Sequence, residues 1–184
     1  MAYRKVLLKP IYLMLLTGVF TFRLSMAIAC KPVYRSIYDW CIHKNKLSGT
    51  TRNLIETLLL KAETTDCTLA QQRLSQMTYL NLDATPLSDP NQVTAGPISD
   101  LRPLSTLTQL KGLNLYHQQL TDLRPLASLV NLGYINLQGT GITKIELLSA
   151  LKNLKSLDLR DNPITDFRPL GDLPKLKQLY LGDL

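Results

Sequence analysis

The side chains that could carry out chemistry are few and are spread along the sequence. The two histidines, His43 and His117, have no partners at metal-ligand spacing, and the three cysteines have neither a CxxC spacing nor a partnering histidine. No GxSxG, P-loop or GxGxxG motif is present. Asp83 and Asp158 could share one face of a sheet, but carboxylates on such a face are common without any chemistry. The sequence therefore predicts no catalytic residue, no metal and no cofactor.

The N-terminal segment has the organisation of an export signal. Residues 1–10 are short and basic, Ile11–Phe22 is an uninterrupted apolar run, and Ala27-Ile28-Ala29 ends the segment with small residues. This order is typical of a secretory signal peptide, so we predict that residues 1–29 are removed after Ala29. The alternative is an uncleaved membrane anchor, because the apolar stretch is nearly long enough to span a bilayer.

Cys30 follows this leader directly. The sequence Ala27-Ile28-Ala29-Cys30 resembles the lipobox of bacterial lipoproteins, in which this cysteine receives the lipid, although Ala27 stands where leucine is usual. Simple secretion is the alternative. Lipidation of Cys30 would leave Cys41 and Cys67 as a pair, and their disulfide would close a loop of about 26 residues and add roughly 3 kcal/mol. If no disulfide forms, both are small buried side chains.

The charge of the chain gives little support for a nucleic-acid partner. The 184 residues carry a formal net charge of +7 at pH 7. Four of the 21 basic residues lie in the leader, which has no acidic residue, so 17 basic and 14 acidic residues remain, a net charge of +3. Phosphate binding needs a concentrated basic stripe. We therefore expect no nucleic acid, and membrane contact only through the leader or a lipid on Cys30.

An apolar pattern with a 22-residue period runs from about Leu74 to the C-terminus. The block Ser99-Asp-Leu-Arg-Pro-Leu104 recurs at Thr121–Leu126 and Thr165–Leu170. The apolar columns that keep this step are Leu104, Leu126, Leu148 and Leu170; Leu107, Leu129, Leu151 and Leu173; Leu113, Ile135, Leu157 and Leu179; Leu115, Leu137, Leu159 and Leu181; and Ile98, Leu120, Ile142 and Ile164. Such alignment indicates a solenoid whose stacked turns bury one continuous core.

The pattern LxxLxLxxNxI matches the leucine-rich-repeat signature, and the 22-residue length with DLRPL after the strand resembles the internalin-type subclass of bacteria. The resemblance covers residues 74–184. It implies an α/β solenoid, a right-handed coil with short parallel strands on its concave face. It also implies a non-enzymatic scaffold that engages a protein or peptide partner.

Two departures from the repeat are expected to affect its regularity. The asparagine column, which normally satisfies backbone groups in the turn, reads Thr85, Gln118, Thr140 and Asn162, so we expect a weak ladder and less regular turns. The first unit lies 33 rather than 22 residues before its partner at Leu113, which predicts an inserted loop over residues 88–98. A binding role for this loop is less favoured than simple tolerance of a surface insertion.

Residues 30–73 lack the repeat and are predicted to form a helical N-terminal cap. The segment 35–43 has helical spacing, and a second helix follows Ser48. Asp66 can cap a third short helix, which would carry Cys67 and Leu74. A solenoid needs such a unit because its first turn would otherwise expose the core. We expect Trp40 to lie in the core of this cap.

The residues between the inward-facing leucines of each strand should form the concave surface. The predicted binding residues are Tyr79, Asn81 and Asp83 on the first strand, Asn114 and Tyr116 beside Gly112 on the second, Tyr134, Asn136 and Gln138 on the third, Asp158 and Arg160 beside Ser156 on the fourth, and Gln178 and Tyr180 on the fifth. Tyrosine and arginine commonly anchor interfaces, so this surface suits a protein or peptide ligand. The alternatives are a structural cell-surface or envelope protein without a dedicated ligand and a cytosolic regulatory adaptor.

The repeat pattern reaches the last residue, Leu184, midway through a turn and without a C-terminal cap. An exposed solenoid end lowers solubility. We expect that the chain is a fragment of a longer array, that the open end self-associates with another subunit, or that a short solenoid tolerates the exposure.

Overall fold

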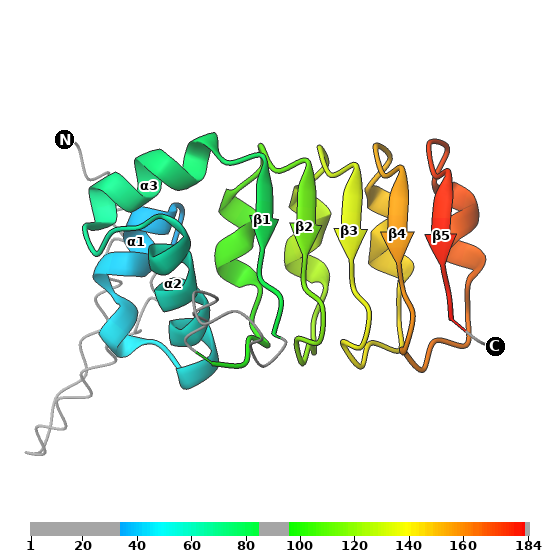
Figure 1. The fold of residues 1–184 in the computed structure, drawn as a ribbon, viewed down its shortest axis with the longest axis horizontal. Helices are drawn as coiled ribbons and strands as arrows, with labels where there is room; N and C mark the ends of the chain where they lie inside the picture. The colour runs from blue at the N-terminus through cyan, green and yellow to red at the C-terminus, as the bar shows by residue number, and fades with distance from the viewer. Residues whose placement is uncertain (1–33, 85–95, 183–184) are drawn as a thin grey trace, which may run out of the picture. The chain divides into compact units, whose positions relative to one another are not determined.

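The computed structural model describes residues 34–84 and 96–182, which belong to one compact unit. The predicted leader, Cys30, Thr85 and most of the predicted insertion, residues 88–95, lie outside the described residues. Within them, helices at the N-terminal end are followed by a repeating alternation of short strands and 3-10 helices (Figure 1).

Five three-residue strands form one parallel sheet in sequence order. They are β1 (Tyr79–Asn81), β2 (Gly112–Asn114), β3 (Tyr134–Asn136), β4 (Ser156–Asp158) and β5 (Gln178–Tyr180). Each strand pairs with the next so that Leu80, Leu113, Ile135, Leu157 and Leu179 stand in one register. The register is the 22-residue step of the sequence, extended to 33 between β1 and β2. The α/β solenoid of stacked leucine-rich turns is confirmed.

A short 3-10 helix lies on the opposite side of each coil. These helices are η2 (Arg102–Thr106), η3 (Arg124–Ser128), η4 (Glu146–Ala150) and η5 (Arg168–Asp172). In η2, η3 and η5 proline stands in the first turn, where its missing N–H interrupts no helical hydrogen bond. The aspartate before each of these helices accepts a hydrogen bond from the arginine backbone N–H at its start. The η4 helix forms without proline, and its Leu148 is buried like Leu104 of η2 and Leu126 of η3.

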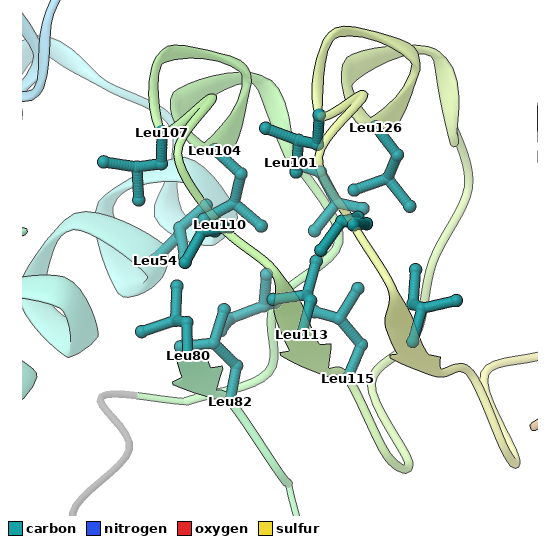
Figure 2. Close-up of a cluster of buried hydrophobic side chains, with 14 of the residues drawn as sticks. Leu54, Leu80, Leu82, Leu101, Leu104, Leu107, Leu110, Leu113, Leu115 and Leu126 are labelled. Carbon is teal, nitrogen blue, oxygen red and sulfur yellow. The ribbon is translucent and has the colours of Figure 1, made fainter. Parts of the chain in front are cut away.

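The core is a continuous stack of leucine and isoleucine side chains between the sheet and the 3-10 helices. Figure 2 shows leucines of the first turns packed together, with Leu54 from the cap among them. Leu104, Leu113 and Leu115 are completely buried. Burial of each such side chain stabilises the fold by about 1.5–3 kcal/mol. A single turn would not be stable alone, because the conformational entropy lost on ordering its residues costs a comparable free energy. Stacking therefore stabilises each turn through its neighbours.

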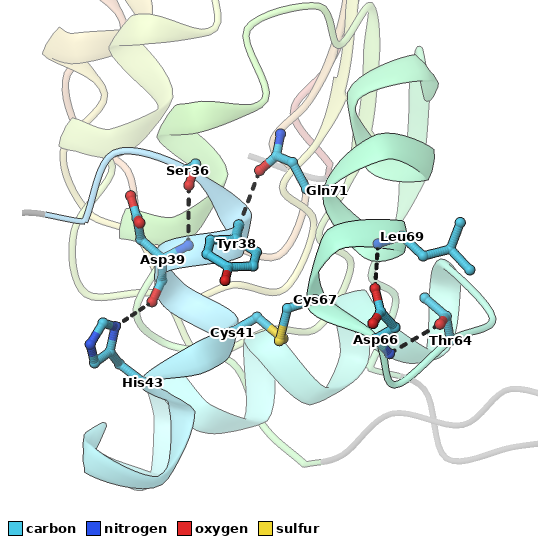
Figure 3. The surroundings of a disulfide bond; sticks show 10 residues. All are labelled: Ser36, Tyr38, Asp39, Cys41, His43, Thr64, Asp66, Cys67, Leu69 and Gln71. Atoms are coloured by element: carbon cyan, nitrogen blue, oxygen red, sulfur yellow. Dashed lines mark hydrogen bonds between the residues drawn. A yellow bond between two sulfur atoms is a disulfide. The ribbon is translucent and has the colours of Figure 1, made fainter. Parts of the chain in front are cut away.

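Three helices form the N-terminal cap. They are α1 (Ile37–Ile42), α2 (Gly49–Lys61) and α3 (Cys67–Gln76), with the short η1 (Lys44–Lys46) between the first two. Ser36 and Asp66 cap α1 and α3 through side-chain oxygens that accept hydrogen bonds from Asp39 N and Leu69 N (Figure 3). Ser48 occupies the predicted N-cap position of α2, but its hydroxyl hydrogen-bonds Thr51 Oγ1 rather than a backbone N–H.

A disulfide joins Cys41 of α1 to Cys67 at the start of α3, as Figure 3 shows. The two residues are 26 positions apart in sequence, so the bond closes a loop that contains all of α2. Trp40, beside Cys41, is 5% exposed and stacks on Tyr34 with 4.2 Å between ring centroids. The prediction that Trp40 belongs to the core of the cap is confirmed.

Two predicted boundaries can be compared with the described residues. Leu74 is predicted both on the third helix of the cap and at the start of the repeat. In the structure α3 runs to Gln76, and Leu74 is a buried residue in its last turn, so the helix of the cap and the first repeat overlap there. The predicted insertion at residues 88–98 includes Ile98, but this residue is fully buried, as its place in the apolar column requires.

The prediction of a weak polar ladder is also wrong. Gln118 is completely buried, accepts a hydrogen bond from Ile98 N and donates one to the Leu82 carbonyl. One turn on, the Thr140 hydroxyl donates to the Leu137 carbonyl. Asn162 then accepts from the backbone N–H groups of Thr140 and Ile142 and donates to three carbonyls of the turn. Glutamine and threonine therefore satisfy the backbone in place of asparagine.

Candidate functional site

The outer face of the sheet, which we call the concave face, presents two rows of residues that run from strand to strand. The first row consists of Tyr79, Gly112, Tyr134, Ser156 and Gln178, and the second of Asn81, Asn114, Asn136, Asp158 and Tyr180. The alternation of strand side chains places both rows opposite the buried leucines. The structure thus brings together the predicted binding residues of the five strands.

The three asparagines of the second row are tied to the backbone. Asn81, Asn114 and Asn136 each accept a hydrogen bond through Oδ1 from the N–H group two residues further on, at 2.9–3.2 Å. The Asn114 amide also donates to Asn81 Oδ1 at 2.9 Å. The sequence predicts these side chains only as ligand contacts. They also fix the end of each strand, so they form a rigid polar floor.

Two tyrosines of the first row lie over a glycine. The ring centroids of Tyr79 and Tyr134 are 6.3 Å apart, and a Cβ atom on Gly112 would come within 2.6 Å of the Tyr79 ring. The glycine therefore lets Tyr79 lean across β2 toward Tyr134. Tyr79 is 53% exposed. Burial, followed by the nearby Tyr79, raises the pKa of Tyr134, so this phenol stays a neutral hydrogen-bond donor well above neutral pH.

The C-terminal half of the concave face is charged but internally paired. Asp158 is only 6% exposed, and Arg160 binds it with two N–H groups, with 2.7 Å between Nη2 and Oδ2. The hydrogen bonds to this carboxylate raise the pKa of Arg160. The guanidinium also lies 5.6 Å from the centre of the Tyr180 ring. A buried carboxylate needs such a partner. Arg160 therefore stabilises the buried Asp158 and is also exposed on the concave face.

The strand ends add a third group of side chains, some of which are not predicted as site residues from the sequence. Tyr116 stacks on His117 with 3.9 Å between centroids, and Gln138 donates to Asp161 Oδ2 at 2.7 Å. His117, Gly139 and Asp161 stand one repeat apart and all have positive φ, between 57° and 65°. The His117 ring lies where a side chain on Gly139 would be. The sequence signal for this turn is the glycine at position 139, which shares its place in the 22-residue repeat with His117 and Asp161.

Asp83 and Asp158, the two carboxylates that could have shared a face, belong to different groups. Asp83 follows β1, whereas Asp158 is in β4, with two strands between them and Arg160 bound to the latter. In the described part of the chain no three histidine, cysteine or acidic residues are grouped as metal ligands. None of the helices among the described residues has the length and apolar character needed to cross a membrane.

Comparison with known proteins shows that the repeats are similar to known leucine-rich repeats. The family model of leucine-rich repeats in two copies matches residues 130–170 and 152–184. An internalin (inlF) of Listeria monocytogenes is similar in structure, with a TM-score of 0.50 and 36% identity over 60% of this chain and 36% of that one. The chain therefore spans about a third of this internalin's length. No curated protein sequence matches the chain.

Two further solved structures are similar over much of the chain. A leucine-rich-repeat protein of Leptospira interrogans has 28% identity and a TM-score of 0.49, over 62% of this chain and 27% of that one. Internalin C2 of Listeria monocytogenes has 28% identity and a TM-score of 0.41, over 61% and 54%.

Proposed function

The chain is a bacterial-type leucine-rich-repeat protein with internalin-like repeats, and from this premise we propose that it is a non-enzymatic scaffold that binds a protein or peptide through its concave face. The observation that carries the proposal is the tyrosine pair of exposed Tyr79 and half-buried Tyr134 beside the fixed asparagine floor. Large aromatic side chains on a rigid support bind with little loss of conformational entropy.

The partner should make its strongest contacts with the N-terminal half of the concave face. Around β1 to β3 both rows are uncharged, and Tyr79 offers a phenol and an open ring face. Around β4 the charges of Asp158 and Arg160 are already paired with each other, so breaking them for a ligand would cost free energy. We therefore propose a partner segment with an apolar or aromatic anchor and hydrogen-bonding groups for the asparagine amides.

Binding should be sensitive to the tyrosines of the concave face. With the partner captured by the full chain and then purified, Tyr79→Ala combined with Tyr134→Ala should raise the Kd by about tenfold or more, since aromatic anchors each contribute over 1 kcal/mol. The melting temperature should change little. Glu146→Ala with Leu147→Ala, two exposed residues of η4, is the matched control and should bind normally. Equal binding by the tyrosine variant would exclude the concave face.

Export is a further element of the proposal. The Cys41–Cys67 disulfide supports it, because disulfides persist in oxidising compartments. Cleavage after Ala29 and lipidation of Cys30 stay predictions, as does self-association through the exposed last turn. Intact mass spectrometry of the native protein would report cleavage, lipid and disulfide together. An unprocessed leader with free thiols on Cys41 and Cys67 would contradict export and favour a cytosolic adaptor, and light scattering would test the self-association.

A further inference from the structure

A stripe of lysines lies along the edge of the sheet where the strands begin, the upper edge in Figure 1. Lys111, Lys155 and Lys177 each stand one residue before a strand, and Lys152 and Lys175 lie in the same connections. All five are exposed. We call these five residues the lysine stripe. It is separate from the two rows of the concave face.

Backbone hydrogen bonds hold the stripe in line. The Lys111 carbonyl accepts from Gly133 N, the Gly133 carbonyl from Lys155 N, and the Lys155 carbonyl from Lys177 N, at 2.8–2.9 Å. Positions joined in this way are about 4.8 Å apart from turn to turn. The lysines are therefore close enough to repel one another at moderate ionic strength, where screening acts over about 10 Å.

No lysine of the stripe forms an ion pair with an acidic side chain in the described part of the chain. Residues 107–111, 129–133, 151–155 and 173–177 contain no aspartate or glutamate. The ion pairs found among residues 34–84 and 96–182 all join arginine to aspartate. Lys152 and Lys175 donate to neutral oxygens, the Asp172 carbonyl and Asn153 Oδ1. The stripe thus offers an anion ammonium groups that are not held in ion pairs.

An open hollow of about 400 Å³ interrupts the stripe at Gly133. It is lined by Lys111, Asn131, Gly133, Asn153, Lys155 and Lys175. A Cβ atom on Gly133 would make only ordinary contacts, the nearest 3.7 Å away, so the surrounding atoms do not require glycine at this position. Because glycine has no side chain, the hollow at this position stays open. Both asparagine amides are anchored, because each donates to a carbonyl of the preceding turn at 2.9 Å.

We propose that the lysine stripe binds an acidic polysaccharide, with one carboxylated or sulfated sugar seated in the hollow at Gly133. Ammonium groups are compact charges that suit hydrated carboxylate and sulfate groups. The asparagine side chains can hydrogen-bond sugar hydroxyls. A linear polymer with regularly spaced charges matches lysines that repeat from turn to turn. The residues that line the hollow are lysine, asparagine and glycine, so it offers no aromatic side chain to stacked bases and no aliphatic residue to a peptide anchor.

The test is retention of the full chain on immobilised dextran sulfate, whose charges are sulfates, and on polygalacturonate, whose charges are carboxylates, at low salt. Lys111→Gln, Lys155→Gln and Lys175→Gln together should weaken binding by about tenfold or more to at least one polymer, because the charges that displace counterions are lost. Lys46→Gln, Lys61→Gln and Lys144→Gln remove the same charge elsewhere and should change binding by no more than about twofold. The polymer that retains the chain to the higher salt concentration identifies the preferred anionic group.

Gly133→Gln tests the hollow without changing the charge, and it should weaken binding several-fold while leaving the melting temperature unchanged. The proposal is overturned if neither polymer is retained, if both lysine triples weaken binding equally, or if Gly133→Gln binds normally. Tighter binding of poly-glutamate or of single-stranded DNA than of either polysaccharide would also overturn it.

Discussion

The two ends of the sheet carry the same sequence pattern in different surroundings. Leu80 in β1 and Leu179 in β5 occupy the same position of the repeat, yet Leu80 is 2% exposed and Leu179 is 39% exposed. The helical cap covers β1, and Leu54 of α2 lies in the same buried cluster (Figure 2). Among the described residues, nothing packs beyond β5. A leucine of the repeat becomes a core residue only when a neighbour covers it on both sides.

The largest effect should come from truncating this leucine at the two ends. Leu80→Ala should lower the free energy of unfolding by about 2–5 kcal/mol, because it leaves a cavity between cap and sheet. Leu179→Ala should cost at most about 1 kcal/mol, because much of that side chain is already in water. Urea denaturation of both variants measures the difference. Equal losses would show that burial does not distinguish the ends.

The disulfide should matter to the covered end alone. Cys41→Ala with Cys67→Ala removes a cross-link over 26 positions and should cost roughly 3 kcal/mol. Amide hydrogen exchange should then rise in α1 to α3 and β1 but not in β4. Cys30→Ala is the control and should leave exchange unchanged. Uniform acceleration along the whole solenoid would instead mean that cap and repeats unfold as one unit.

The polar column allows a smaller comparison between turns. Gln118→Leu would leave Ile98 N and the Leu82 carbonyl without their buried partner and should cost about 1–3 kcal/mol. Thr140→Val, one turn on, loses hydrogen bonds of one hydroxyl and should cost less, about 1 kcal/mol. Thermal melts of the two variants decide the order. A larger loss for Thr140→Val would contradict the predicted order, and an unchanged melting temperature for Gln118→Leu would mean that Gln118 is dispensable for joining the first turns.

The smallest effect concerns the exposed ion pairs beside the 3-10 helices. Hydrogen bonds from Arg168 lower the pKa of Asp166 from its ordinary 3.8 to about 2. Because the folded pKa is the lower one, the pair stabilises the fold above about pH 4, and this contribution is lost as the pH falls through 2. In an NMR titration, Arg168→Gln should return the Asp166 midpoint toward 3.8, whereas Arg124→Gln should not. A midpoint near 3.8 in the unmodified protein would contradict the pairing.

The period, the strand register and the helical cap could be predicted because they depend on local pattern. Apolar columns such as Leu113, Ile135 and Leu157 specify which residues face the core, and this holds independently of what the protein binds. The polar column could not be judged from residue type, since Gln118 replaces asparagine only because its longer side chain reaches both Leu82 and Ile98. The Tyr79–Gly112–Tyr134 arrangement likewise depends on a contact between side chains of different strands.

The surfaces were harder to predict than the fold. The overall charge after the leader is modest, and it conceals a stripe of lysines that only the stacking of turns brings into line. The sequence predicts Arg160 as a ligand contact, but its bond to Asp158 depends on how deeply that carboxylate is buried. Sequence therefore identifies which residues share a row, while pairing and burial decide which of them are free to bind.

The most direct test of the central claim is site-specific photo-crosslinking to the captured partner. A photoreactive residue at Tyr79 on the concave face is compared with one at Leu147 on η4, which has similar exposure, 53% against 40%. The concave-face account predicts a covalent adduct with the partner from position 79 and none from position 147. Adducts from position 147 alone would contradict it and place binding on the opposite side of the solenoid.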